Sequence, residues 1–259
     1  MRILFVGDVV AQPGRRVIKS VLPGYLSDNK IDFCVINAEN SAHGLGCSIR
    51  IVDELHDIGA DIITMGNHTF SNSDFIRQAS QRDFVVIPSN VSSSWEGNAY
   101  TIIEKDGKKL AVFNLMGQVD MGMYSDSPFS KADSILEELK DKGINNIILD
   151  FHAEATSEMR AMGFYLNGRV SAVIGTHTHV QTADNQVLSN GTGYITDAGM
   201  TGVCDSVIGM DIDTSLRRFV DKLPARYEPA EGDSFMCGVI LTLDDSGKCT
   251  EIKRFCEYE

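Results

Sequence analysis

Short runs of consecutive apolar residues alternate with amphipathic segments along the first two thirds of the chain. A run that is apolar at almost every position, such as ILFVGD, is typical of a strand buried on both faces. Apolar residues spaced three and four apart between these runs predict helices instead. The predicted strands span residues 3–8, 32–39, 61–68, 84–90, 145–153 and 170–179.

Capping and turn residues set the expected boundaries of several elements. A helix is expected from near Pro13, because proline fits the first turn of a helix. Another is expected to begin at Ser48, whose hydroxyl suits an N-cap, and to end at Gly59. Further helices are predicted over 131–142 and 155–167, the first after a Gly/Met/Ser-rich loop at about 118–130. Hairpin turn signals fall at Asp106-Gly107, Asn190-Gly191 and Ser246-Gly247.

The order of these elements predicts an α/β fold of two packed mixed β-sheets flanked by helices, an αββα sandwich. The first sheet is expected to be rich in parallel strands and the second to be mixed or antiparallel. No internal repeat or Pro/Ser-rich linker divides the chain, so residues 1–259 are predicted to form a single domain.

Composition adds an expectation about the compartment. No stretch approaches the ~20 uncharged apolar residues that a membrane span needs. Asp8 interrupts the first apolar run and no small-residue cleavage site follows it, so this run is interpreted as a strand and not as a signal peptide. None of the six cysteines forms a CxxC pair, which favours reduced thiols. A cytoplasmic protein without membrane contact is expected.

The net charge of the chain limits the classes of partner that it is expected to bind. The net charge is −13 and basic residues are scattered, whereas proteins that grip long nucleic acids present a basic face. No extended nucleic-acid groove is therefore expected. A small phosphate ester could still bind if metal cations supplied local positive charge. Homo-oligomerisation stays open.

Polar side chains follow the ends of five predicted strands. In open α/β sheets the functional site lies outside the carboxyl ends of the strands, so these residues would converge. Each residue alone could be a turn former, a helix cap or a hydrogen-bonded core residue. That reading would have to explain the polar residues at each of the five strand ends separately. A single shared site explains them together and is favoured. The residues are Asp8, Glu39, Asn40, Asn67, His68, His152, His177 and His179.

The donor atoms of this set indicate a metal site of a particular kind. Oxygen and nitrogen donors without thiolate exclude a cysteine-rich structural zinc site. Imidazole suits Fe, Zn, Mn, Ni or Cu, and carboxylates suit harder ions. Seven candidate ligands, all of these residues except His68, exceed what one catalytic ion needs and fit two ions roughly 3.5–4 Å apart. Glu39 is the candidate bridge, because a carboxylate has two oxygens.

Several motifs resemble the calcineurin-like metallophosphoesterases. These are GDVV at Asp8, GNHTF at 66–70, the lone His152 and GTHTH at 175–179. Two departures are informative: Asp8 is not followed by the histidine of a D-x-H motif, and NAEN at 37–40 carries a Glu where that superfamily has a bridging Asp. With these departures, the chain resembles the YmdB-like subfamily of bacterial 2′,3′-cyclic-nucleotide phosphodiesterases. The supporting segments are INAENSAHGLG, DFHAEATSE, GTHTHVQTAD and DAGMTGVCDSVIG.

The resemblance implies a centre with two metal ions per chain, expected to be iron, with manganese or zinc as alternatives. One metal would be held by Asp8, Glu39, Asn40 and His179. The other would be held by Glu39, Asn67, His152 and His177. His68 would be the catalytic acid and not a ligand.

The expected function is metal-dependent hydrolysis of a small phosphodiester, a 2′,3′-cyclic nucleotide. A hydroxide activated by the two metals would attack phosphorus, and His68 would protonate the leaving ribose oxygen. Two alternatives stay open. One is a phosphomonoesterase or protein phosphatase of the same superfamily. The other is a metal-containing, nucleotide-sensing regulatory protein without significant turnover.

Overall fold

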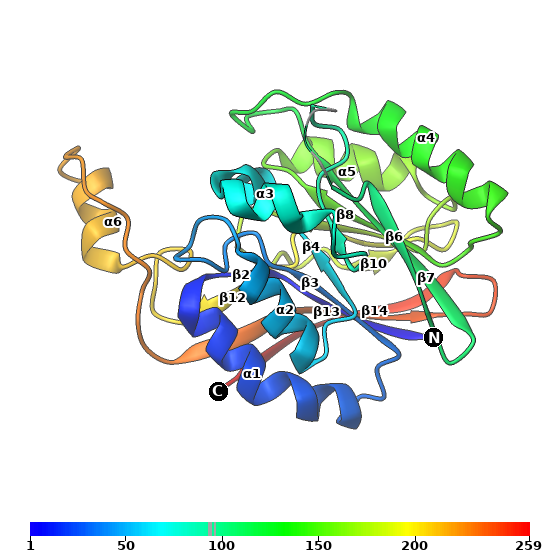
Figure 1. Ribbon diagram of the computed structural model, residues 1–259, viewed down its shortest axis with the longest axis horizontal. Coiled ribbons are helices and arrows are strands. Elements are labelled where there is room, and N and C mark those ends of the chain that lie inside the picture. Colours follow the sequence, from blue (N-terminus) through cyan, green and yellow to red (C-terminus); the bar gives the residue numbers. More distant parts are fainter. Residues whose placement is uncertain (93–94, 96) are drawn as a thin grey trace.

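Two β-sheets pack face to face in the computed structural model, which describes residues 1–92, 95 and 97–259 (Figure 1). The strands of the first sheet are β1 (Arg2–Val6), β2 (Asp8–Val9), β3 (Phe33–Asn37), β4 (Ile62–Thr64), β5 (Val85–Val86), β12 (Met200–Val203), β13 (Ser234–Leu243) and β14 (Cys249–Tyr258). They run in the order β2-β12-β13-β1-β3-β4-β5, and β14 pairs with β13. Strands β1, β3, β4 and β5 are parallel, whereas β13 runs antiparallel to both β1 and β14.

The second sheet is also mixed. Its strands are β6 (Tyr100–Lys105), β7 (Lys108–Met116), β8 (Ile147–His152), β9 (Ala172–Thr176), β10 (Gln186–Val187) and β11 (Gly193–Ile195). They run in the order β10-β11-β9-β8-β7-β6. Strands β7, β8, β9 and β11 are parallel, and antiparallel hairpins lie at both edges. The predicted α/β architecture of two mixed sheets is thus confirmed.

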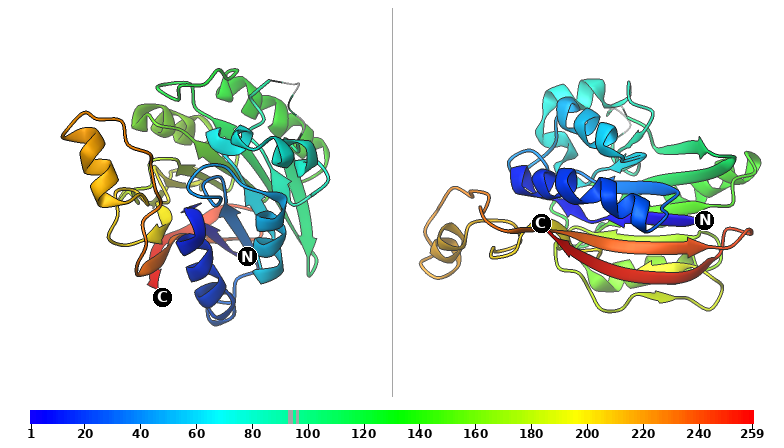
Figure 2. Two further views of the ribbon diagram at one scale, coloured as in Figure 1. Left: turned by 60° about the vertical axis from the view of Figure 1, so that its left-hand side comes forward. Right: turned by 90° about the horizontal axis from the view of Figure 1, so that it is seen from below.

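Helices cover the outer faces of both sheets (Figure 2). On the first sheet these are α1 (Ala11–Asp28), α2 (Ile49–Ile58) and α3 (Ser73–Ala79); on the second they are α4 (Pro128–Asp141) and α5 (Thr156–Tyr165). A 3₁₀ helix, η1 (Asn67–Ser71), follows β4, and α6 (Ile212–Phe219) lies apart from both layers. Among the described residues, no helix is both long and apolar enough to span a bilayer.

Side-chain alternation explains why the central strands are apolar at almost every position. In β1, Leu4 and Val6 pack into the cluster beneath α1 and α2. Ile3 and Phe5 point the other way, into the core between the two sheets. Because successive side chains of a strand face opposite sides, a sheet covered on both faces needs an apolar residue at each position.

Several predicted strands extend beyond the carboxyl ends of the observed ones. The strand predicted over 61–68 ends at Thr64, and the one predicted over 170–179 ends at Thr176. Only Val85–Val86 form a strand within the segment predicted over 84–90. In each case the chain leaves the ladder, so the polar residues that follow lie beyond the strand, in loops or, for Asn67 and His68, in η1.

Helix boundaries agree better with the sequence. Ser48 accepts a hydrogen bond from the Ile51 backbone as the N-cap of α2, and Gly59 is its C-cap with φ of 129°. The first helix begins at Ala11, two residues before Pro13. The helix predicted over 131–142 begins earlier, at the proline that opens α4.

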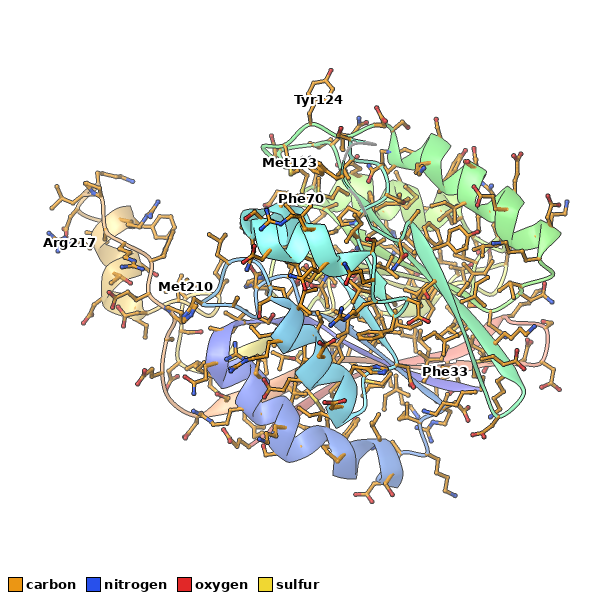
Figure 3. The ribbon with its side chains drawn as sticks, viewed as in Figure 1. Phe33, Phe70, Met123, Tyr124, Met210 and Arg217 are labelled. Atoms are coloured by element: carbon orange, nitrogen blue, oxygen red, sulfur yellow. The ribbon has the colours of Figure 1, made fainter. Side chains whose placement is uncertain are left out.

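A projecting arm, residues 212–227, stands away from the two-sheet body and was not predicted from the sequence. It contains α6 and is closed at its base by a hydrogen bond from the Asp211 amide to the Glu228 carbonyl. Figure 3 shows Met210 near the base of the arm and Arg217 on its outer side. The views in Figures 1 and 2 agree that α6 lies clear of the sheets.

A pair of glycine substitutions tests the packing at the sheet edge. A Cβ on Gly175, in β9, would overlap the backbone carbonyl oxygen of Thr196, so Gly175→Ala is expected to destabilise the fold by about 1–3 kcal/mol or more. Gly24, in α1, has no atom near its would-be Cβ, so Gly24→Ala is expected to stabilise by about 0.5–1 kcal/mol. Urea unfolding of both variants measures these changes. Equal effects of the two substitutions would contradict the close approach at Gly175.

Candidate metal centre

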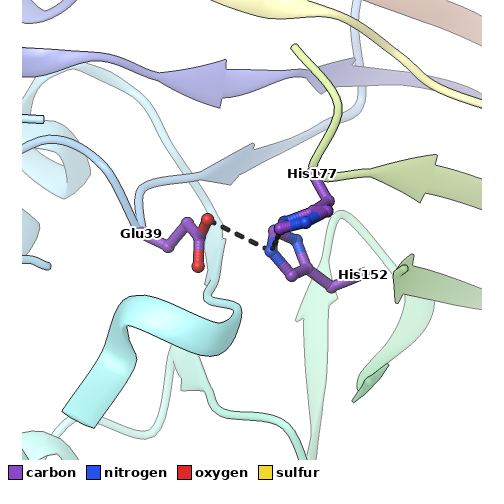
Figure 4. Close-up of side chains that lie close together, drawn as sticks. All are labelled: Glu39, His152 and His177. Atoms are coloured by element: carbon purple, nitrogen blue, oxygen red, sulfur yellow. Dashed lines mark hydrogen bonds and ion pairs between the residues drawn. The ribbon is translucent and has the colours of Figure 1, made fainter. Parts of the chain in front are cut away.

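Three side chains from different elements come together at the carboxyl edge of the two sheets. Glu39 follows β3, His152 ends β8 and His177 follows β9. One ligand atom of each lies within 4.8 Å of those of the other two, as Figure 4 shows. Glu39 and His152 are fully buried, and His177 is partly buried. Residues more than a hundred positions apart in the sequence thus share one site.

A chain of hydrogen bonds behind His152 fixes which of its nitrogens faces the site. The Thr176 hydroxyl donates to the buried Asp150 carboxylate at 2.7 Å. Its oxygen therefore accepts from His152 Nδ1, which lies 2.9 Å away. With the proton on Nδ1, Nε2 of the neutral ring presents a lone pair to the site. An acid that orients a ligand histidine in this way is common behind metal sites.

The ring of His177 is oriented the other way, with Nδ1 and not Nε2 facing the site. Its Nε2 lies 3.2 Å from the Glu154 carboxylate, which can only accept, so Nε2 carries the proton. The Nδ1 atom is then the free acceptor, 3.1 Å from His152 Nε2. Burial, followed by the charge of a protonated His152, lowers the pKa of His177 to about 3, which keeps this ring neutral.

The convergence of these atoms fits a cation. Asn67 Oδ1 lies 2.9 Å and Glu39 Oε1 lies 3.1 Å from His152 Nε2, and the Nδ1 of His177 approaches the same atom. When His152 is neutral, all of these atoms are electron-pair donors facing one another, an arrangement that repels itself unless a cation lies between them. Mixed nitrogen and oxygen donors of this type suit Fe, Mn or Zn.

In the metal-free protein, a proton on His152 takes the place of a cation. Burial would favour the neutral form of His152, but Glu39 overrides it and raises the pKa of His152 to about 9. Burial would likewise raise the pKa of Glu39, but His152 and the His68 amide lower it to about 2. Metal binding would therefore displace a proton from His152.

Asp8 contributes a buried carboxylate with an unused oxygen. Its Oδ2 accepts from the His177 backbone amide at 3.0 Å, whereas the buried Oδ1 has no hydrogen-bond partner. Burial raises the pKa of Asp8 well above its ordinary value, and the nearby charge of His152 only partly opposes this. An unpartnered buried oxygen of this kind is costly without a cation.

Asn40 and His179 lie on the other side of Glu39. The Asn40 Nδ2 atom lies 2.9 Å from Glu39 Oε1 and 3.0 Å from His179 Nε2. His179 Nδ1 donates to the Ile208 carbonyl at 2.9 Å, which leaves Nε2 facing the site. Asn40 thus presents its amide nitrogen inward, and a ligand role requires the amide to turn and present its oxygen. Among the described residues these groups form no second metal-sized cluster.

The backbone of the H-x-H segment differs from the prediction. His177 and His179 were expected on an extended strand, where alternate residues share a face. Instead both have positive φ, 110° and 66°, and lie in a turn beyond β9. Such conformations are uncommon for residues other than glycine and often mark functional sites. The turn brings both rings to the site by a different route.

His68 lies at the edge of this cluster, in η1. Its backbone amide donates to Glu39 Oε2 at 3.0 Å. The side chain is half-buried, and within the described part of the chain its imidazole has no hydrogen-bond partner. All eight residues singled out from the sequence are therefore linked to one another around Glu39 and His152.

The absence of a side chain at Gly66 leaves room for the side chains of Glu39 and His152. A Cβ at this position would overlap both Glu39 Oε2 and His152 Nε2. The φ of −159° is open to any residue, so the close approach of the two side chains, and not the backbone conformation, excludes a side chain here. The glycine of the GNH motif keeps the backbone next to the donor atoms.

Three acidic residues of the site were not identified from the sequence. Asp150 and Glu154 orient His152 and His177 from behind, as described above. Asp197 follows β11 and holds the turn between the two histidines, accepting from the Thr178 amide and hydroxyl at 2.8 Å each. Burial raises the pKa of Asp197 to about 6. The position of Asp197 just after an apolar run is the sequence feature that could have identified it.

Comparisons with known proteins agree with this geometry. The family model of YmdB-like proteins matches residues 4–255. A 2′,3′-cyclic-nucleotide 2′-phosphodiesterase of Bacillus subtilis (strain 168) is 46% identical over 248 residues, covering 96% of this chain and 93% of that protein.

Two crystal structures share the whole fold with a TM-score of 0.93 each. One is a hypothetical protein from Thermus thermophilus, 36% identical, with 100% of both chains covered. The other is a novel phosphatase from Mycoplasma pneumoniae, 31% identical, with 100% of this chain and 94% of that chain covered. These relatives and the buried Glu/His cluster show a hydrolase of the metal-dependent phosphoesterase class. The chain belongs to the YmdB-like protein family.

Proposed function

We propose that this protein hydrolyses 2′,3′-cyclic nucleotides with the help of two metal ions per chain. The observation that carries the proposal is the set of electron-pair donors around His152 Nε2, supplied by Asn67, Glu39 and His177. The cyclic-nucleotide substrate rests on the Bacillus subtilis relative, which is 46% identical across nearly the whole chain.

In this proposal each metal has its own ligand set, and Glu39 belongs to both. One metal is held by Glu39, Asn67, His152 and His177. The other is held by Asp8, Glu39, Asn40 and His179. The unused Oδ1 of Asp8 and the inward-facing Nε2 of His179 support the second set. Iron is proposed as the metal, with manganese and zinc as the alternatives that the donors accept.

When bound, such a pair of cations supplies activation of water and neutralisation of charge on the phosphoryl oxygens. The protein's own task is then to orient the phosphodiester and to deliver a proton. Hydrolysis adds one water across a phosphorus–oxygen bond: the hydroxyl goes to phosphorus, and the leaving ribose oxygen takes up a proton.

His68 is the proposed proton donor. Its backbone is tied to Glu39, so the ring is held at the edge of the centre, while its nitrogens are free of other partners in the described residues. A half-buried histidine in this position can reach a leaving oxygen from outside the ligand set. By analogy with the relative, the 2′ oxygen is the proposed leaving group and a 3′-nucleotide the product.

A substrate panel tests the proposal. The metal-loaded protein is assayed against 2′,3′-cyclic AMP, 3′,5′-cyclic AMP, 3′-AMP and a phosphopeptide, with products separated by chromatography. We expect preferential turnover of the 2′,3′-cyclic nucleotide to the 3′-nucleotide. Faster release of phosphate from 3′-AMP or the phosphopeptide would overturn the substrate assignment.

A phosphomonoesterase is the second candidate. The Mycoplasma pneumoniae structure, 31% identical over the full chain, is described as a phosphatase. The same donors could serve a monoester, and the 3′-AMP arm of the panel separates the two activities. A nucleotide sensor would bind the cyclic nucleotide in the same panel without forming product.

Glu154 is expected to tune the metal affinity of the first ligand set. It accepts from His177 Nε2 and so keeps Nδ1 free for the metal. Glu154→Ala should weaken metal binding by about 10–100-fold, because partners behind ligand histidines have effects of this size. Calorimetric titration of the metal-free protein measures the affinity. The control is Glu137→Ala, which changes an exposed glutamate on α4. Glu158→Ala is unsuitable, because Glu158 accepts hydrogen bonds from the backbone amides of residues 118 and 119. An unchanged affinity in Glu154→Ala would contradict this role.

A further inference from the structure

Two cysteines lie directly opposite each other on the antiparallel strands β13 and β14. The register of this ladder pairs Cys237 with Cys256. Directly opposed residues project their side chains from the same face of a sheet, so the two thiols are neighbours. Both are free in this structure; Cys237 is buried and Cys256 is exposed. The sheet thus holds two thiols side by side, and one of them is open to solvent.

The backbone bonds of Cys237 show that the two cysteines form a non-hydrogen-bonded pair. The Cys237 carbonyl accepts from the Gly7 amide at 2.9 Å, and the Cys237 amide donates to Thr201 Oγ1 at 3.2 Å. Both groups therefore point away from β14. In a pair of this kind the Cα atoms are about 4.5 Å apart. Disulfides join Cα atoms about 4.4–6.8 Å apart, so the ladder itself sets a separation that a disulfide can span.

A cavity of about 350 Å³ lies beside the pair. Its lining includes Cys237, Cys256 and His179. Further along the same face of β13, Val239 and Leu241 are packed into the core between the sheets. Ligand pockets begin at roughly 300 Å³, so a small reactant fits here. The two thiols therefore border an open space, where a reagent can reach them without disturbing the core.

The surroundings of the two thiols give them different roles. Burial, followed by the charge of Cys256, raises the pKa of the Cys237 thiol to about 12. Cys237 also donates its S–H to the Ala198 carbonyl at 3.6 Å. A buried, protonated thiol is a poor first nucleophile, whereas an exposed thiol is the one that a reagent meets. Cys256 is therefore the attacking thiol and Cys237 the resolving one.

We propose that Cys237 and Cys256 form a reversible redox modification site, which a small-molecule disulfide converts to a cross-strand disulfide. The Cys256 thiolate attacks one sulfur of the reagent, breaks its S–S bond and forms a mixed disulfide, releasing one small thiol. Cys237 then attacks the Cys256 sulfur and releases the second small thiol. The two protein thiols lose two electrons to the reagent, and their protons end on the two released thiols. Neither the metals nor the nucleotide substrate takes part.

A third thiol, Cys204, is the competing partner for Cys256. Burial, followed by the charge of Cys256, raises the pKa of Cys204, so the two are near each other. Cys204 lies just beyond β12, however, and its amide bonds to the Asp233 carbonyl, so no ladder sets it opposite Cys256. Among the described residues the three thiols form no group close enough to share a metal ion. The register therefore favours the bridge to Cys237.

Titration of the full chain with oxidised glutathione tests the proposal. After quenching and denaturation, the number of titratable thiols should fall from six to four. The intact mass should fall by the mass of two hydrogen atoms, and peptide mapping should link Cys237 to Cys256. Dithiothreitol should restore all six thiols. A wild-type chain that keeps six thiols, or that carries only glutathione adducts, would overturn the proposal.

Single substitutions separate the two steps. Cys237→Ser should stop at the mixed disulfide, with one glutathione on Cys256, and Cys256→Ser should form no bridge at all. The matched control is Cys204→Ser, which changes a partly exposed cysteine outside the pair and should form the bridge as the wild type does. Circular dichroism verifies that all three variants are folded. A wild-type bridge that maps to Cys204, or one that survives in Cys256→Ser, would overturn the assignment.

Discussion

Replacing His68 by alanine is expected to lower the turnover of 2′,3′-cyclic AMP by about 10²–10⁴-fold, the contribution typical of a positioned acid. The metal content should stay at the wild-type level. The imidazole of His68 lies outside the donor set, and its link to Glu39 is made by the backbone amide, which alanine keeps. Steady-state rates and elemental analysis of the same preparation measure both quantities.

The control is His43→Asn. His43 is an exposed histidine in the loop after Glu39, with φ of 55°, a conformation that asparagine tolerates. Its turnover should match the wild type. If His68→Ala lost metal together with activity, His68 would be a ligand or a support of the site. Full activity in His68→Ala would exclude it as the acid.

Asp8→Asn is expected to have opposite effects on metal binding and on the stability of the metal-free protein. Metal content should fall, because an amide is a weaker ligand than a carboxylate. The metal-free variant should be more stable than the metal-free wild type by on the order of 1 kcal/mol or more, because a buried carboxylate with an unpartnered oxygen is replaced by a neutral group. Thermal unfolding with and without chelator measures the difference.

The pH dependence of this effect has a definite sign. The pKa of Asp8 is raised by burial, so its contribution to stability is fully present below its unfolded pKa of about 3.9 and is lost as the pH rises through the folded value. The advantage of Asp8→Asn should therefore grow as the pH rises from the unfolded pKa to the folded pKa of Asp8, and level off above it. Asp57→Asn, on the exposed side of α2, should show no such trend. A metal-free variant that is less stable than wild type at neutral pH would contradict the account of Asp8.

The placement of the site followed from the sequence because parallel strands end at one edge. Glu39 and His152 follow or close strands that are apolar at most positions and buried at every one, as strands in the middle of a sheet are. Their side chains therefore had to meet. The orientation of each ring could not be predicted, because it depends on Thr176 and Glu154, which reach the rings through tertiary packing.

Other features of the site and the fold could not be predicted from the pattern of residues along the chain. The positive φ angles of His177 and His179 have no sequence signal, since neither glycine nor asparagine is present there. Asp197 looked like an ordinary residue after a strand, and its bonds to Thr178 appear only in the fold. Helix α6 was not predicted because its eight residues lie among turn residues, in a region that favours hairpins.

Metal content per chain, measured by elemental analysis on wild type and Glu39→Ala, tests the central claim most directly. Glu39 lies at the centre of the donor set, 3.1 Å from His152 and 2.9 Å from Asn40, and is assigned to both metals. We expect two metal ions per wild-type chain, as in two-metal phosphoesterase sites, and loss of both in a folded Glu39→Ala protein. A wild-type chain without metal, or a Glu39→Ala variant that keeps its full metal content, would contradict it.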